Sequence, residues 1–441
     1  MIKNSLVFLS FIFAASPVLA QDCPIGSSAL QGPTVYDNMM YDPDTKWIVP
    51  SSDVNLRGYD VDNFFLIALI NREIERRGGR LAVVFPPKRG LFIPDEVYTK
   101  ARDILEGSPK QDLLEEYNSI IKQLEDTGAI VPQTYSAFSN LQQPYFQADH
   151  HWKPEAAAAA ALAVWDALAD VGILRIPLDD GGYVFGPQSR EYKAGSYARV
   201  FNDECRTKIF DESYVYSSTY KTAARNLDQA DSLFGDASDE NFDVTLLGTS
   251  FSAESSNFQF YGALSYFLQA PVENIAVAGG AIDASFEILQ TQSELLDANL
   301  VVWEIAPNHF PIVSHKLRSA TATVLGGCNT SSSIQTISTQ SDGWSDWLSV
   351  DKQSALVELD TQEYFSGQIL VEAGFGEAVE SVIIEKSERT PKEDRTSVWK
   401  TFVGKFDADG DITLPDSIRL KIVDATQDYE ISVAHCQMEN I

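Results

Sequence analysis

Apolar positions in the first two thirds of the chain follow two alternating patterns. Apolar residues three and four positions apart, the spacing of one helix face, occur in residues 62–77, 108–126, 154–172, 257–268 and 284–296. Short continuous apolar runs, typical of buried strands, are residues 81–85, 129–131, 243–247, 274–278 and 300–305. This alternation predicts an α/β domain with a parallel sheet and helices on both faces. Residues 21–60 and 175–240 follow neither pattern, and we expect irregular structure in the first and a long insertion in the second.

The pattern changes after about residue 318, where serine, threonine and glycine dominate. Short strand-like runs then follow at residues 355–359, 364–371, 381–384, 398–405, 418–423 and 429–434. Many short strands without a long helix predict a β-sandwich. We therefore expect an α/β domain over residues 21–320 and an all-β sandwich over residues 321–441.

The N-terminal residues have the features of a cleavable export signal. Lys3 precedes an apolar run from Ser5 to Ala15, and residues 17–20 offer a small-residue cleavage site. No later stretch is long and apolar enough to span a bilayer. We expect a signal peptide over residues 1–20 and a soluble, exported protein.

Charge and cysteine content add two constraints. The formal net charge of −30 argues against nucleic acid and anionic membranes as partners, and a polyanionic ligand would need a locally basic groove. None of the cysteines has metal-ligand spacing. In an oxidising compartment we expect two disulfides, with three possible pairings, and one bridge per domain is the simplest choice. Four free thiols are the alternative. The cysteines are Cys23, Cys205, Cys328 and Cys436.

Two short motifs supply the groups of a serine acyl-transfer site. Asp149 and His151 are two positions apart, so in an extended segment both face one partner while His150 faces away. Ser250 follows the apolar run 244–247, at the carboxyl end of a strand, where parallel sheets bind ligands. The simpler alternatives are a histidine that caps the next helix or is held in the core by Asp149, and a serine in an ordinary turn.

These motifs resemble those of a known family. Residues 149–154 (Asp-His-His-Trp-Lys-Pro) and 248–252 (Gly-Thr-Ser-Phe-Ser) are similar to the paired motifs of the AlgX/AlgJ group of SGNH hydrolase-like enzymes, and residues 302–305 match a strand of that group. The layout of signal peptide, SGNH-like domain and β-sandwich carbohydrate-binding module resembles the AlgX type. The AlgJ type lacks the module.

The resemblance implies an O-acetyltransferase that acts on an exported polysaccharide, with alginate favoured. Ser250 would attack an acetyl donor, His151 would be the general base, and Asp149 would fix the imidazole tautomer. It further implies a periplasmic location, an acetyl donor passed from a membrane acyltransferase, and an export complex as partner. We expect no cofactor and no metal ion. Residues 407–411 begin like a calcium loop, but Ile418 stands where that loop needs glutamate.

Substrate contacts are predicted at five positions. Lys88 and Arg89 follow a strand end and would meet an anionic sugar or an oxyanion, with a solvated basic pair as the alternative. His309 replaces part of the Pro-Glu-Arg sequence usual in the family after residues 303–305, and is either a site residue or a structural replacement. Arg395 and Trp399 lie in the densest basic cluster, which is either a sugar-binding face or a solvated hairpin.

Two other functions fit the same residues. An SGNH acetylesterase would use the same serine, histidine and aspartate but pass the acetyl group to water. A polysaccharide-binding scaffold of an export complex would keep the fold with a vestigial site. Assays of acetyl transfer, acetyl release and polymer binding separate the three functions.

Overall fold

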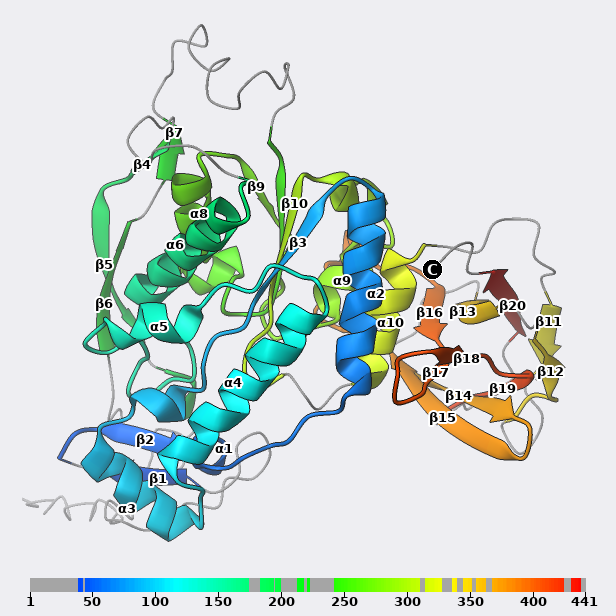
Figure 1. Cartoon of the computed structure of the whole chain (residues 1–441), viewed down its shortest axis with the longest axis horizontal. Helices are drawn as coiled ribbons and strands as arrows, with labels where there is room; N and C mark the ends of the chain where they lie inside the picture. The colour runs from blue at the N-terminus through cyan, green and yellow to red at the C-terminus, as the bar shows by residue number, and fades with distance from the viewer. Residues whose placement is uncertain are drawn as a thin grey trace, which may run out of the picture.

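The computed structural model shows two packed parts of the 441-residue chain (Figure 1). It describes residues 39–42, 44–173, 183–193, 195–199, 212–217, 220–222, 242–309, 314–326, 335–338, 344–350, 354–361, 367–423 and 430–437. Within these ranges, none of the helices has the length and apolar character needed to cross a membrane.

The centre of the first part is a four-stranded sheet in the order β3-β10-β8-β9. Its strands are β3 (Arg80–Val84), β10 (Leu300–Glu304), β8 (Val244–Leu247) and β9 (Val272–Asn274). All neighbouring pairs are parallel, and the register sets Trp303 beside Leu247. The predicted α/β fold with a parallel sheet is therefore confirmed, and the carboxyl ends of β8 and β10 meet at one edge.

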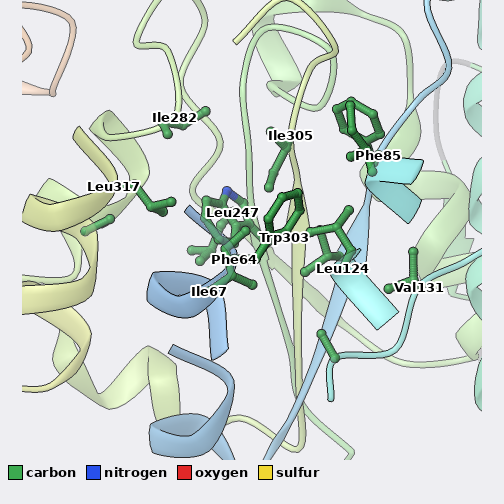
Figure 2. Close-up of a cluster of buried hydrophobic side chains, with 14 of the residues drawn as sticks. Phe64, Ile67, Phe85, Leu124, Val131, Leu247, Ile282, Trp303, Ile305 and Leu317 are labelled. Carbon is green, nitrogen blue, oxygen red and sulfur yellow. The ribbon is translucent and has the colours of Figure 1, made fainter. Parts of the chain in front are cut away.

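Helices cover both faces of the sheet, because the strands alternate apolar side chains between two hydrophobic clusters. Val301 and Trp303 of β10 enter one cluster, and Val302 enters the other. Burial contributes about 1.5–3 kcal/mol for each large apolar side chain. The first cluster, shown in part in Figure 2, includes side chains of α2 (Asp62–Arg76), α3 (Asp95–Leu105), α4 (Lys110–Asp126), α9 (Ala284–Ile288) and α10 (Ser314–Val324). The second includes those of α5 (Thr134–Ser139), α6 (Pro154–Asp170) and α8 (Phe260–Leu268).

Helix α6 positions the segment that carries His151. Pro154 occupies its first turn, where a missing N–H breaks no helical hydrogen bond, and the alanine run that follows favours helix. The alanines on one face, such as Ala156 and Ala160, are fully buried and let α6 pack closely on α8. The helix ends before Gly172, which adopts a φ of +75°. His151 is thus held at the start of a rigid helix.

Four segments differ from the sequence-based prediction. The strand expected over residues 274–278 lies earlier, as β9 at Val272–Asn274. The helix expected over residues 284–296 stops at Ile288, and a 3-10 turn, η5 (Ser293–Asp297), follows. The run 129–131 forms only one parallel bridge, between Ile130 and Ala82. The described part of the segment expected to be irregular holds a β-hairpin, β1 (Met39–Asp42) and β2 (Trp47–Pro50). The remaining short elements are α1 (Ser51–Val54), η1 (Arg89–Phe92), β4 (Tyr183–Phe185), β5 (Gln188–Lys193), β6 (Glu212–Ser217), β7 (Tyr220–Thr222) and η4 (Glu254–Ser256).

The second part contains two antiparallel four-stranded sheets. One has the order β11-β20-β13-β16, with β11 (Gln335–Ser338), β20 (Glu430–Gln437), β13 (Ser354–Asp360) and β16 (Val398–Phe402). The other has the order β12-β19-β14-β15, with β12 (Leu348–Ser349), β19 (Ser417–Ile422), β14 (Gln368–Phe375) and β15 (Ala378–Glu385). Smaller elements are η6 (Lys392–Asp394), β17 (Lys405–Phe406) and β18 (Ile412–Thr413). Leu359 and Leu420, from different sheets, share one buried cluster, so the sheets pack as a β-sandwich.

The sandwich is anchored on helices α9 and α10 of the first part (Figure 1). Arg318 of α10 donates hydrogen bonds to the backbone carbonyls of Phe402 at 3.3 Å and Gly404 at 2.7 Å. Glu287 of α9 accepts the backbone N–H of Ser387 at 2.6 Å. The predicted boundary at residue 320 stays a prediction, and α10 runs across it.

Candidate active site

Ser250, His151 and Asp149 form a hydrogen-bonded chain at the carboxyl edge of the sheet. His151 Nε2 lies 2.7 Å from Ser250 Oγ, and His151 Nδ1 lies 2.6 Å from Asp149 Oδ1. Ser250 stands in the turn after β8, and His151 precedes α6, so the fold brings together residues 99 positions apart. This geometry suits an acid that orients an imidazole and an imidazole that accepts a hydroxyl proton.

Asp149 is buried, and hydrogen bonds engage both of its carboxylate oxygens. Oδ2 accepts the backbone N–H of Ser196 at 3.0 Å, and Oδ1 accepts that of His151 at 3.0 Å. A Cβ at Gly195 would lie 2.1 Å from the Ala148 carbonyl oxygen, so this close approach requires glycine. Burial alone would raise the pKa of Asp149, but the charge and hydrogen bond of His151 outweigh burial and hold that pKa well below its usual value. Asp149 is therefore ionised and fixes the imidazole.

His150 does not face away from the site, which corrects the alternation expected for an extended segment. Its ring centroid lies 3.8 Å from that of His151, and its Nδ1 lies 2.7 Å from the Ser196 hydroxyl. The chain bends at residues 147–151 instead of extending, so the two rings lie together. Burial, followed by the charge of His151, holds the pKa of His150 well below its usual value. The His150 ring is therefore neutral at pH 7.

The same residues offer a grouping that a metal ion would also use. Ligand atoms of Asp149, His150 and His151 all lie within 4.8 Å of one another. However, His151 Nδ1 faces Asp149 Oδ1 at 2.6 Å, and a ring nitrogen that donates its proton has no lone pair for a metal. The hydrogen-bonded arrangement fits proton transfer better than metal binding.

Glu304, the last residue of β10, holds the turn that carries Ser250. Its Oε2 accepts the Thr249 backbone N–H at 2.8 Å, the Thr249 hydroxyl at 2.9 Å and the Ser252 hydroxyl at 3.0 Å. The strand register sets Glu304 level with Gly248, where a Cβ would lie only 2.9 Å from Glu304 Oε2. Burial raises the pKa of Glu304 to about 7, although the hydrogen bonds from Thr249 and Ser252 lower it. The motifs do not predict Glu304. The sequence feature that could have identified it is an acidic residue at the end of an otherwise apolar strand.

A small pocket lies beside the serine and histidine. His150 and Phe251, which adjoin His151 and Ser250 in sequence, both line it. The other lining residues are Ser52, Asp53, Arg57, Lys88, Arg89, Tyr197, Pro307 and Asn308. The pocket therefore combines aromatic surface with polar and cationic groups next to the reactive hydroxyl.

Lys88 and Arg89 line this pocket, but each of them pairs with a carboxylate of the protein itself. Arg89 is 3% exposed and pairs with Asp53, and its Nε donates to the Phe146 carbonyl at 2.9 Å. Lys88 pairs with Glu116 and donates to the Asn55 carbonyl at 3.1 Å. A structural role therefore replaces the substrate contact predicted for Arg89, and Lys88 has a satisfied charge.

His309 lies close enough to the site for the charge of His151 to affect its pKa. Burial, followed by the charges of Lys316, Arg57 and His151, lowers the pKa of His309 to about 4. Its ring is therefore neutral at pH 7 and can exchange hydrogen bonds without adding charge. A substrate contact by His309 stays a prediction.

Trp399 is a core residue, which corrects its predicted role in sugar stacking. Its side chain is 0% exposed in the cluster between the two sheets of the sandwich. The alternation of burial along β16 turns it inward, a direction that the surrounding basic residues in the sequence do not reveal. Arg395 donates to the backbone carbonyls of Thr390, at 3.0 Å, and Glu388, so it holds the β15–β16 connection in place. Neither residue supports a sugar-binding face at this cluster.

The remaining predictions fall outside what the structure describes. The predicted signal peptide, residues 1–20, and Cys23, Cys205 and Cys328 lie outside the described residues, and so does the side chain of Cys436. Export and the two disulfides stay predictions.

Residues 55–307, more than half of the chain, match the family described as "SGNH hydrolase-like domain, acetyltransferase AlgX". The alginate biosynthesis protein AlgX of Pseudomonas putida is 28% identical over 254 residues, which cover 54% of this chain and 49% of that protein. The probable alginate O-acetylase AlgJ of Pseudomonas aeruginosa is 24% identical over 271 residues, which cover 57% of this chain and 65% of that protein. The chain thus spans about half the length of the AlgX relatives it matches.

The solved structure of Pseudomonas aeruginosa AlgX resembles this chain with a TM-score of 0.63 and 19% sequence identity. The superposition covers 90% of this chain and 94% of that one. At this identity the likeness concerns the fold alone. It extends past residue 307 and agrees with an SGNH-like sheet domain followed by a strand-rich region.

Proposed function

The chain belongs to the family of SGNH hydrolase-like domains described for the acetyltransferase AlgX, and we propose that it is a polysaccharide O-acetyltransferase. The observation that carries this proposal is the 2.7 Å separation of His151 Nε2 and Ser250 Oγ, with Asp149 behind the imidazole. The names of the AlgX and AlgJ relatives refer to alginate biosynthesis and alginate O-acetylation. Alginate is therefore the favoured acceptor.

In the first half-reaction, Ser250 is acetylated. His151 takes the hydroxyl proton as Ser250 Oγ attacks the carbonyl carbon of the acetyl donor, and Asp149 stabilises the imidazolium that forms. The tetrahedral intermediate collapses, the leaving group of the donor takes the proton from His151, and acetyl-serine remains. The backbone N–H of Ser250 meets no acceptor among the described residues, so it is suited to bind the oxyanion.

In the second half-reaction, a sugar hydroxyl takes the place of the donor's leaving group. His151 removes its proton, the sugar oxygen attacks the acetyl carbon, and Ser250 leaves with that proton. The products are an acetylated sugar and the free enzyme. Transfer requires the sugar hydroxyl to outcompete water, and a sandwich that holds the polymer would raise the local concentration of acceptor.

The cellular setting forms part of the same proposal. We propose export by the signal peptide of residues 1–20, action in the periplasm and polymer binding by the β-sandwich. The acetyl group would come from a membrane acyltransferase, and the protein would work within a polysaccharide export complex. The signal-like sequence and the resemblance to the AlgX type support this setting.

Acetyl transfer from a small acetyl ester to oligouronates tests the proposal. Ser250→Ala should abolish transfer and leave polymer binding intact, whereas Ser255→Ala, an exposed serine in η4, serves as the matched control and should retain transfer. Release of acetate without transfer would favour an acetylesterase. Absence of any turnover, with polymer binding retained, would favour a non-catalytic scaffold.

A further inference from the structure

Three cations line the pocket beside Ser250, and two of them are neutralised by carboxylates. Lys88 pairs with Glu116, and Arg89 pairs with Asp53. Arg57 has no carboxylate within ion-pair distance in the part of the chain that the structure describes. Its Nη1 donates to the backbone carbonyl of Asn308 at 3.0 Å. Among the described residues, Arg57 is therefore the cation of this pocket that forms no ion pair with a carboxylate.

The backbone that carries Arg57 is fixed from the protein interior. Glu116 Oε1 accepts the backbone N–H groups of Arg57 at 2.9 Å and Gly58 at 3.0 Å, while Oε2 of the same carboxylate pairs with Lys88. Glu116 has only 9% of its side chain exposed. One buried carboxylate therefore both satisfies Lys88 and holds the Arg57 backbone at the pocket, while the Asn308 carbonyl orients the guanidinium.

We propose that this pocket binds the carboxylate of an acidic sugar in the acceptor chain, and that Arg57 selects acidic over neutral acceptors. The inference rests on the proposed acetyl transfer to a polysaccharide and adds the residue that selects the acceptor by its charge. A planar guanidinium pairs with a carboxylate through two hydrogen bonds, which gives both affinity and orientation. Because the chain carries a net charge of −30, an anionic polymer needs such a local cation to approach.

Other residues that line the pocket carry groups of the kind that contact sugars. Phe251 and Tyr197 supply aromatic surface, and the amide of Asn308 supplies groups that exchange hydrogen bonds with hydroxyls. Phe251 adjoins Ser250, so a sugar whose carboxylate reaches Arg57 presents its hydroxyls next to the acetylated serine.

The test compares acceptors that differ in charge. Transfer from a neutral acetyl ester is measured with an oligouronate and with a neutral oligosaccharide of equal length, for wild type, Arg57→Gln, Arg57→Lys and the matched control Arg72→Gln on the exposed face of α2. The expected change in KM corresponds to the loss of one hydrogen-bonded pair of opposite charges. Arg57→Gln should raise the KM for the oligouronate about 10- to 100-fold more than that for the neutral acceptor. Arg57→Lys should restore part of this preference, and Arg72→Gln should preserve it fully.

Other outcomes overturn the inference. An equal rise in KM for both acceptors would make Arg57 structural, and a matching rise in the KM for the acetyl ester without acceptor would place it at the donor. Calorimetric binding of the oligouronate to Ser250→Ala and to Ser250→Ala with Arg57→Gln needs no turnover. Weaker binding by the double variant is expected, even if wild type transfers no acetyl group. Equal binding would refute the role of Arg57 while leaving the acetyl-transfer proposal to its own assay.

Discussion

The indole N–H of Trp152 donates a hydrogen bond to the backbone carbonyl of Phe251 at 2.9 Å. Trp152 follows His151 and Phe251 follows Ser250, so this bond ties the two segments one residue beyond the imidazole and the hydroxyl. Trp152 is fully buried, and its ring meets that of Phe251 edge to face at 5.3 Å. This anchor makes the separation of His151 and Ser250 a property of the packed core.

Trp152→Phe should therefore lower both stability and activity. The substitution leaves the buried Phe251 carbonyl without its donor, which costs about 1–3 kcal/mol of unfolding free energy, and it loosens the alignment of His151 with Ser250. Urea unfolding and kcat provide the two readouts. Trp165→Phe, which changes a half-buried indole on α6, is the control. A variant that matches wild type in both readouts would show that the bond does not position the site.

Asp149→Asn should lower kcat about 10²- to 10⁴-fold with a smaller change in KM. The amide keeps the size of the side chain but removes the charge that stabilises the imidazolium, and it disrupts the hydrogen bond that fixes the tautomer. Steady-state kinetics of acetyl transfer, with circular dichroism to confirm folding, measure this effect. A loss below tenfold in a folded variant would argue against the proposed role of Asp149.

Glu304→Gln should change how stability depends on pH. Burial raises the pKa of Glu304 from 4.5 to about 7 in the folded protein. Between these values the folded state binds one more proton than the unfolded state, so this group's contribution to stability declines as pH rises. The difference in unfolding free energy between wild type and Glu304→Gln should fall by about 3 kcal/mol from pH 4.5 to pH 7. Other titrating groups contribute equally to both proteins and cancel in this difference. A free-energy difference that stays constant from pH 4.5 to pH 7 would contradict the raised pKa of Glu304.

The burial of Trp399 predicts separate effects on stability and binding. Trp399→Ala should lower the unfolding free energy by about 3–5 kcal/mol because it opens a cavity in the sandwich core. Trp399→Phe should refill most of that space and bind the polymer like wild type. Retained stability but lost polymer binding in Trp399→Phe would restore the sugar-stacking role that the motif suggested.

Much of the sheet domain can be predicted from the chain, because β3, β8 and β10 are mainly apolar runs and the long helices carry regular apolar faces. The run 243–247 and the alanines after Pro154 are examples. The short edge strand β9 has no such run and is misplaced by the pattern. The sequence places Ser250 after strand β8 and His151 before helix α6, because the end of β8 and the start of α6 are both clear in the sequence. The helix α9 is shorter than its apolar pattern predicts, and a 3-10 turn follows it.

The supporting residues of the site depend on tertiary contacts that local patterns do not encode. Glu304 reaches Thr249 only through the parallel register of β8 and β10. Arg57 and Arg89 look alike in sequence, and only the position of Asp53 shows which guanidinium is neutralised. The direction of Trp399 likewise follows from sheet pairing and not from its basic neighbours.

Mass spectrometry of the acetylated intermediate tests the central claim most directly. Wild type is mixed with a neutral acetyl ester without acceptor, quenched in acid and digested, and the peptide that contains Ser250 is examined. The account predicts one added acetyl group on Ser250, lost when an oligouronate is added before the quench and absent from His151→Ala. An unmodified Ser250 in a protein that transfers acetyl groups at full rate would contradict it.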